Sequence, residues 1–301
     1  MTLVIGSLQL GMIYGLLALG VYITFRILNI PDLTVDGSFT LGLAVSASFT
    51  VAGHPYLGIV LALLAGALAG CITGLLQTKV GIHPILAGIL TMSGLYSVNL
   101  FVMGAKSNLS LIGKNTLFSD LLTALPALGK DGSQLAVGCV FAFVCVAVCI
   151  WFFKTQLGLS IRATGNNEDM VRASSINVDA VKIITLAVAN GCVGLSGAVI
   201  AQYQGFADVS SGTGMVVVGL ASVIIGEAIV GKRSVSVGLI SAIAGSLVYR
   251  LIIALALKTS FFPSYMLKLV SAVIVVIALA IPTVKRTMQL RKIRKGGRRN
   301  A

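Results

Sequence analysis

The sequence predicts an all-α protein, a polytopic transmembrane helical bundle of about nine spans with one span broken or re-entrant. Of its 301 residues, 57% are hydrophobic and only 10% are charged, and the mean hydropathy is +1.01. Soluble domains carry about 25% charged residues, because a surface that faces water needs them. The charges are also clustered, which leaves apolar stretches close to the roughly 20 residues that a membrane-spanning helix needs.

Nine apolar stretches are the predicted spans. They lie at residues 3–25, 39–53, 57–77, 84–104, 134–153, 182–204, 215–231, 237–257 and 265–284. They exceed the ten or so residues of a barrel strand and lack its alternation of apolar and polar positions. A helix also satisfies its own backbone hydrogen bonds in lipid, so helices are expected throughout.

The second stretch is the one expected to be broken. Its apolar part is short, and residues 29–37 before it contain a proline, two aspartates and a glycine. Asp32 and Asp36 either hold this segment through caps and turns or contact a transported solute.

The basic residues predict the orientation, because Lys and Arg concentrate on the cytoplasmic side of a membrane. Sixteen of the 22 Lys and Arg residues fall in alternate loops and in the tail after the last span. The N-terminus is therefore expected outside and the C-terminus inside. We expect one transmembrane domain over residues 1–284, with a cytoplasmic loop at 154–182, and a basic cytoplasmic tail over 285–301.

The net charge of +13 does not predict nucleic-acid binding. The one dense basic run follows directly after a span, where such clusters bind anionic lipid headgroups. The sequence also predicts no metal site. All five cysteines fall within apolar spans, and Cys145 and Cys149 share a helix face with no histidine or acid near them.

A phosphate-binding loop is excluded at residues 226–233. The letters match G-x-x-x-x-G-K, but Arg233 stands where a serine or threonine should hold magnesium. The motif also needs a strand before it and a helix after it, whereas an apolar span precedes this one. ATP hydrolysis by this chain is therefore not predicted.

The loop over residues 154–182 is the most informative part of the sequence. Asn167 can cap a short helix whose first turn holds Glu168 and Asp169, where the helix dipole favours acids. We expect this helix to end near Ser174, and Asn177 or Asp179 to cap the next one. A compact helix across the cytoplasmic face suits the docking of a soluble partner.

This loop resembles the permease subunits of the branched-chain amino acid and ribose type of ABC importer. The matching positions are Thr155, Gly158, Arg162, Ala163, Gly165, Asn167, Ala173, Ile176 and Val178. Residues 14–20 and 218–226 are also similar to the family, and 32–39 looks like a branch associated with aromatic amino acids or other small organic solutes. One departure is Ser175, where the family commonly has glycine; a serine hydroxyl can end a short helix.

The resemblance implies that this loop holds the helix that couples the permease to its ATPase. The residues implied in coupling are Arg162, Gly165, Asn167, Glu168, Asp169, Met170, Arg172, Ala173 and Ile176. The implied partners are ABC ATPase subunits that carry the ATP and magnesium, an extracytoplasmic binding protein and a second permease chain. A homodimer is expected for the permease pair, with a heterodimer as the alternative. No cofactor is expected on this chain.

The implied function is ATP-driven import of a small organic solute, an amino acid above all, across the bacterial cytoplasmic membrane. A sugar or a nucleoside is the alternative solute. A secondary transporter is a second alternative, but it should show internal repeats with paired broken helices. A membrane enzyme is a third, but the spans contain no histidine and a single glutamate.

Three further polar residues lie within predicted spans, where such groups usually face a pathway or a partner. Glu227 and Arg250 either form a structural ion pair with each other or line the pathway. Asn190 is expected to make a hydrogen bond between helices.

Overall fold

The computed structural model describes residues 2–258 except 125, 127, 128 and 232, together with the isolated positions 269, 272, 273 and 276. Apart from these four positions, the predicted ninth span at 265–284 and the basic tail at 285–301 lie outside the described residues. The helices are α1 (Thr2–Tyr22), continued by the π-helical segment η1 (Ile23–Ile27), α2 (Thr34–Val51), α3 (Pro55–Thr78), α4 (Pro84–Val102), α5 (Leu117–Ala124), α6 (Gly129–Lys154), α7 (Gln156–Asn166), α8 (Glu168–Ala173), α9 (Val178–Gln204), α10 (Met215–Val230) and α11 (Val235–Lys258). Two short strands, β1 (Asn108–Ser110) and β2 (Phe206–Asp208), pair antiparallel.

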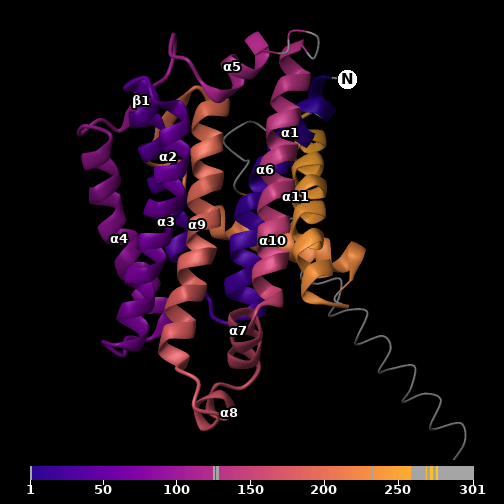
Figure 1. Ribbon diagram of the computed structural model, residues 1–301. Coiled ribbons are helices and arrows are strands. Elements are labelled where there is room, and N and C mark those ends of the chain that lie inside the picture. Colours follow the sequence, from indigo (N-terminus) through magenta and orange to yellow (C-terminus); the bar gives the residue numbers. More distant parts are fainter. Residues whose placement is uncertain are drawn as a thin grey trace, which may run out of the picture.

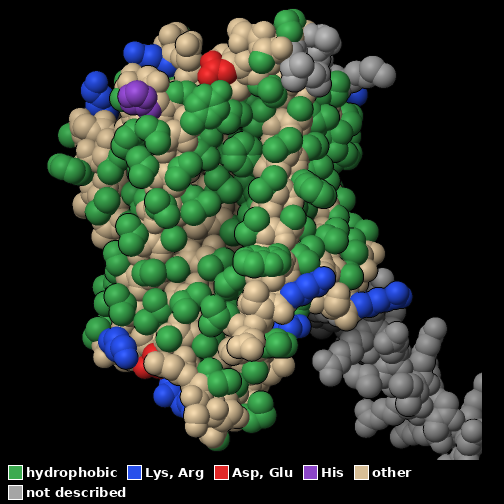
Figure 2. Space-filling view, in the orientation of Figure 1, with side chains coloured by type: hydrophobic (Ala, Val, Ile, Leu, Met, Phe, Trp, Pro, Cys, Tyr) green, Lys and Arg blue, Asp and Glu red, His purple; other side chains and the backbone are tan. Residues whose placement is uncertain are grey.

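The predicted polytopic helical bundle is confirmed. Within the described residues, six helices are long and apolar enough to cross a membrane, and α10 is a shorter apolar helix. The visible face carries a broad hydrophobic belt, with charged side chains gathered toward its two ends (Figure 2). This is the surface that a multi-pass membrane protein presents, because lipid contacts the belt and water contacts the ends.

Helix α9 forms the centre of the bundle and packs against α1, α2 and α3. Glycines of α3 permit its close approach. A Cβ added at Gly66 would lie 2.4 Å from the carbonyl oxygen of Asn190, and one at Gly70 would lie 2.1 Å from that of Leu186. Small residues at a spacing of four let helix backbones meet in this way, so the position of α9 depends on these glycines.

The two ends of the bundle differ. The N-terminus, β1 and α5 lie at one end, and α7 and α8 project from the opposite end (Figure 1). This arrangement is the one expected if the N-terminus is outside and the 154–182 loop is cytoplasmic; the direction of insertion stays a prediction.

The interruption predicted before the second span is confirmed. After η1 the backbone turns at Asn29, whose φ is 57°, and α2 then begins at Thr34 rather than near residue 39. Thr34 lies inside the bundle, since its hydroxyl is 2.8 Å from that of Thr73 on α3, which in turn donates to Thr91 on α4 at 3.0 Å. Because Thr91 is seven residues into α4, α2 begins about 10 Å above the start of that helix.

Candidate coupling and transport sites

The caps predicted in the 154–182 loop are confirmed. The Asn167 side chain accepts a hydrogen bond from the backbone N–H of Met170 at 3.1 Å and begins α8, which ends at Ala173. Of the two candidate caps for the next helix, Asn177 is the one used, and it accepts from Ala180 N–H at 3.1 Å. Sequence reasoning missed α7, which Thr155 caps and which makes the whole loop a helical hairpin.

Ser175 does not act as the sequence suggested. Its backbone is left-handed, with a φ of 61°. An L-residue pays about 1–2 kcal/mol there, whereas glycine adopts this conformation freely. The family's glycine therefore reflects the sharp turn between α8 and α9. The serine hydroxyl that bonds back to the end of α8 belongs instead to Ser174, which donates to the carbonyl oxygen of Met170 at 3.0 Å.

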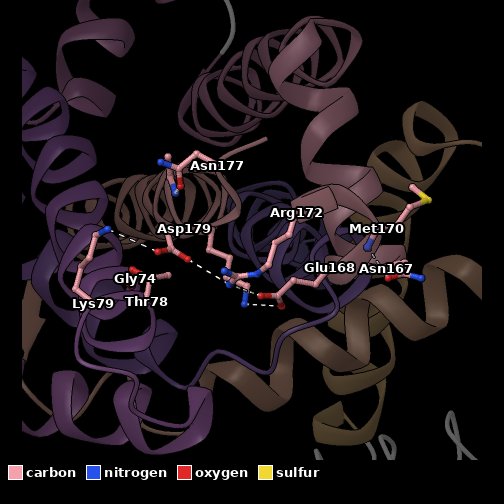
Figure 3. A network of polar contacts seen from close by, with 11 residues as sticks. Gly74, Thr78, Lys79, Asn167, Glu168, Met170, Arg172, Asn177 and Asp179 are labelled. Atoms are coloured by element: carbon pink, nitrogen blue, oxygen red, sulfur yellow. Dashed lines mark hydrogen bonds and ion pairs between the residues drawn. The ribbon is translucent and has the colours of Figure 1, made fainter. Parts of the chain in front are cut away.

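A chain of ion pairs fixes α8 to the end of the bundle opposite the N-terminus (Figure 3). Glu168 contacts Arg172 at 2.9 Å and Lys182 at 2.7 Å. Asp179 contacts Arg172 at 3.4 Å and Lys79 at 3.6 Å. The hydrogen bond from Lys182, with a smaller effect of Arg172, holds the pKa of Glu168 below its usual value. The network thus joins α8 to α9 and to the end of α3.

Two other predicted coupling residues lie on α7. A Cβ added at Gly165 would lie 1.9 Å from the carbonyl oxygen of Ile27, so the end of α7 contacts η1 backbone to backbone. Arg162 donates to the carbonyl oxygen of Gly158 at 3.4 Å, one turn earlier on the same helix.

The remaining predicted coupling residues form an exposed surface. The side chain of Met170 is 56% exposed and that of Ile176 is 36% exposed, and Asp169 and Ala173 are exposed as well. Leu157 and Leu159 of α7 add two more exposed apolar side chains. The hairpin therefore has exposed apolar side chains at the end of the molecule opposite the N-terminus.

Asp32 and Asn190 meet inside the bundle. Asn190 donates from Nδ2 to Asp32 Oδ2 at 2.7 Å, while Asp32 Oδ1 accepts from the backbone N–H of Thr34 at 2.8 Å. Both side chains are buried. The hydrogen bond predicted for Asn190 thus joins α9 to the segment that leads into α2. Asp32 holds the start of α2, which is the capping alternative considered from the sequence.

Asp36 caps a helix that is distant in the sequence. Its two carboxylate oxygens accept from the backbone N–H groups of Gly214 and Val216, each at 2.8 Å. These groups form the N-terminus of α10, where a negative charge is favoured by the helix dipole. Local caps were expected for Asp36; the structure joins the first turn of α2 to the start of α10 instead.

The ion pair considered between Glu227 and Arg250 is not formed. Glu227 of α10 pairs with Arg26 of η1, whereas the Arg250 guanidinium lies 3.6 Å from the centre of the Tyr14 ring. Tyr14 and Arg26 are twelve residues apart on one continuous helical segment, about 18 Å, which no side chain can bridge. Counting residues along the two predicted spans places Glu227 and Arg250 at similar depths only if both spans begin at the membrane surface. Helix α10 begins inside the bundle instead, so the count does not apply.

The cysteines are closer together than the sequence suggested. Cys192 of α9 joins Cys145 and Cys149 of α6, and the three sulfur atoms lie within 4.8 Å of one another. A closed structural zinc site has four ligands, and no described histidine or carboxylate belongs to this group. Three thiols between two apolar helices, two of them buried and that of Cys145 half-buried, pack as small hydrophobic side chains do.

Lys79 and Arg26 are functional candidates that sequence reasoning did not single out. In the sequence, both residues serve only to predict the orientation of the chain in the membrane. Their acidic partners, Asp179 and Glu227, are 100 and 201 positions away, so no local pattern pairs them. The sequence does mark each of them as the sole Lys or Arg of a short loop between two predicted spans.

The chain is similar to several known transport proteins. The model of the family described as the permease component of branched-chain amino acid transport systems matches residues 3–279. The chain is 36% identical to a tyrosine transport system permease protein of Clostridioides difficile, over 92% of this chain and 90% of that one. It is 27% identical to a ribose import permease protein of Escherichia coli, over 85% and 78%.

A third similar protein is an autoinducer 2 import system permease protein of Yersinia enterocolitica, which is 28% identical over 75% of this chain and 59% of that one. No solved structure matches the chain. The family model spans nearly the whole sequence, and the capped α8 hairpin on which the resemblance was first seen is present in the fold. The chain therefore belongs to the family of permease components of branched-chain amino acid transport systems.

Proposed function

We propose that this chain is the membrane-spanning permease subunit of an ABC importer in the bacterial cytoplasmic membrane. It moves a small organic solute, an amino acid above all, from an extracytoplasmic binding protein into the cytoplasm. ATP and magnesium are bound by partner ATPase subunits. Family membership supports the permease role, and the name of the tyrosine transport relative, with its 36% identity, supports the amino-acid solute.

The α7–α8 hairpin is the observation that carries the coupling role. It exposes Met170, Ile176, Leu157 and Leu159 to water, as an unoccupied docking surface would. Helix α8 is held to α9 by the Glu168–Lys182 and Arg172–Asp179 pairs, and Asp179 in turn contacts Lys79 at the end of α3. An element that is rigid at its base and apolar at its tip can transmit a partner's movement to the bundle, because displacement of the tip must move the helices to which it is attached.

A second copy of the chain is proposed to complete the transport pathway. Large apolar side chains are exposed along α3, α4 and α6, including Leu68 at 64%, Phe101 at 85% and Phe143 at 76%. One face of this kind is available to a second permease chain, and lipid covers the rest.

A sugar is the second candidate solute. The relatives named for ribose and autoinducer 2 import cover 85% and 75% of this chain, so the family tolerates solutes without an amino group. Uptake of a labelled amino acid against labelled ribose separates the two candidates.

The coupling role can be tested with Gly165→Ala. The added methyl group meets the Ile27 carbonyl oxygen, so α7 must move away from η1. We expect ATP-dependent uptake in proteoliposomes to fall at least tenfold while the chain still inserts and purifies. Gly6→Ala is the matched control, because a Cβ at this helical glycine has nothing within 4 Å.

Co-purification tests the assignment itself. A tagged chain isolated from its native host should bring down an ATP-hydrolysing subunit, and replacing Met170 and Ile176 by aspartate should release that subunit. Uptake driven by an ion gradient, with no ATPase bound, would instead identify a secondary transporter.

A further inference from the structure

A cavity of about 410 Å³, mostly apolar but with several polar side chains in its wall, lies between α2, α4 and the loop before α10. Its lining includes Asp36 and Thr40 of α2, Asn99 of α4 and Thr213 of the loop. Helix α10 is 16 residues long, about 24 Å, which is less than the roughly 30 Å of membrane hydrocarbon. Its far end carries the Arg26–Glu227 pair, and its N-terminus, with the cavity beside it, lies next to Asp36 in the first turn of α2.

Asn99 points to a ligand in this cavity. Its side chain is 1% exposed, and Nδ2 donates to the carbonyl oxygen of Gly37 at 3.4 Å. Its Oδ1 has no hydrogen-bond partner. Exchanging the two amide atoms would set two acceptors against each other, so the carbonyl oxygen is the group left without a partner. A buried acceptor of this kind destabilises the fold unless a donor reaches it.

The charge of the lining defines that donor. Asp36 places a carboxylate in the cavity wall, and the residues that line the cavity include no Lys, Arg or His. The N-terminus of α10, where a transporter could bind the carboxylate of a solute, already holds Asp36. A carboxylate has about four acceptor positions, so Asp36 can accept further bonds while it caps the helix.

We propose that this cavity binds the ammonium group of an amino-acid-like solute during import, with Asn99 Oδ1 and Asp36 as its acceptors. The proposal rests on the importer function proposed above and narrows its solute class to primary amines. Asp36 then has two roles, because it fixes the start of α10 and attracts the cation. A solute without an ammonium group gains nothing from this charge.

Direct binding to the purified permease tests the proposal without the binding protein. Three probes share one aromatic ring: L-phenylalanine carries both charged groups, phenylethylamine only the ammonium, and 3-phenylpropionate only the carboxylate. We expect the first two to raise the thermal unfolding temperature of the permease at millimolar concentration, since a ligand that binds only the folded state stabilises it. We expect 3-phenylpropionate to have no effect.

Two substitutions of Asn99 sharpen the test. Asn99→Leu removes the acceptor and should abolish protection by phenylethylamine, with unfolding of the ligand-free protein unchanged or slightly later. Asn99→Asp adds a charged acceptor and should lower the Kd about threefold to tenfold, because charge-assisted hydrogen bonds are stronger. Val98→Ala on the exposed side of α4 is the control that should leave both ligands' effects intact.

Several results would overturn the proposal. These are protection by 3-phenylpropionate equal to that by phenylethylamine, no protection of the wild-type chain by either amine, and full protection of Asn99→Leu. ATP-dependent uptake of ribose together with any of these results would leave the importer function standing and remove only the ammonium site. Failure of all ATP-dependent uptake would remove the importer function itself.

Discussion

At the scale of single residues, backbone conformation and charge decide how the α7–α8 hairpin is held. Ser175 has a left-handed backbone at the turn between α8 and α9, and Glu168 holds two cationic partners. Both features act on the same six-residue helix, which is too short to be stable by itself in water. Small changes at either residue should therefore be measurable.

Ser175→Gly is expected to stabilise the hairpin by about 1 kcal/mol, because glycine removes the strain of a Cβ at positive φ. Hydrogen exchange of the α8 amides should slow accordingly. Ser174→Gly is the control: its φ is −85°, so no strain is relieved and the hydrogen bond to Met170 is lost. A larger gain at 174 than at 175 would contradict this explanation.

The lowered pKa of Glu168 predicts a dependence on pH. Its folded-state pKa lies below the unfolded one, so its stabilisation is complete above about pH 5 and is lost as the pH falls through the folded-state value. Because the side chain is 38% exposed, we expect at most about 1 kcal/mol. The difference in unfolding temperature between wild type and Glu168→Gln should be present at pH 7 and vanish once the pH falls below the folded-state pKa. A difference that persists there would mean that packing, not charge, is responsible.

At the scale of elements, α10 connects the two proposed sites. Its N-terminus is held by Asp36 beside the cavity, and near its other end Glu227 pairs with Arg26 of η1. Gly165 of α7 contacts Ile27 of the same η1 segment. Helix α10 is therefore connected at one end, through η1, to the α7–α8 hairpin. At its other end it is connected, through Asp36, to the cavity wall.

The Arg26–Glu227 pair should respond unequally to removal of its two partners. Only 6% of the Glu227 side chain is exposed, against 34% for Arg26. Arg26→Gln takes this cation from a buried carboxylate and should destabilise the chain more than Glu227→Gln, which leaves an arginine that water can reach. Denaturation of the two single variants and the double variant in detergent measures this, and equal losses from the single variants would contradict the prediction.

At the scale of the whole molecule, the chain combines a buried central helix with two elements that begin inside the bundle. α9 is enclosed by α1, α2 and α3, while α2 and α10 start at depths where a spanning helix would continue. Irregular backbone at membrane depth is tolerated where protein buries it or where it lines a cavity. Both conditions are met, at Asp32 and at Asp36.

The direction of insertion is testable with single cysteines in a background that lacks the native five. Met170→Cys on α8 should react with a membrane-impermeant maleimide only in inverted vesicles. Ile112→Cys, at a residue that is 89% exposed near β1, should react only in intact cells with a permeable outer envelope. The reverse pattern would place the N-terminus inside and exclude the hairpin as the ATPase contact.

The sequence by itself determined the features that depend on residues close together in the chain, namely the apolar spans and the helix caps. Eight of the nine predicted spans correspond to described helices. The cap of α8 is the asparagine expected, and the cap of α9 is one of the two residues considered, because hydropathy and capping act over a few positions. Tertiary structure alone decided that Asp36 caps α10, that Glu227 meets Arg26 and that Cys192 joins Cys145. These partners are 178, 201 and 47 positions apart. Such contacts follow from how the helices pack and where they begin, which a run of local residue types does not encode.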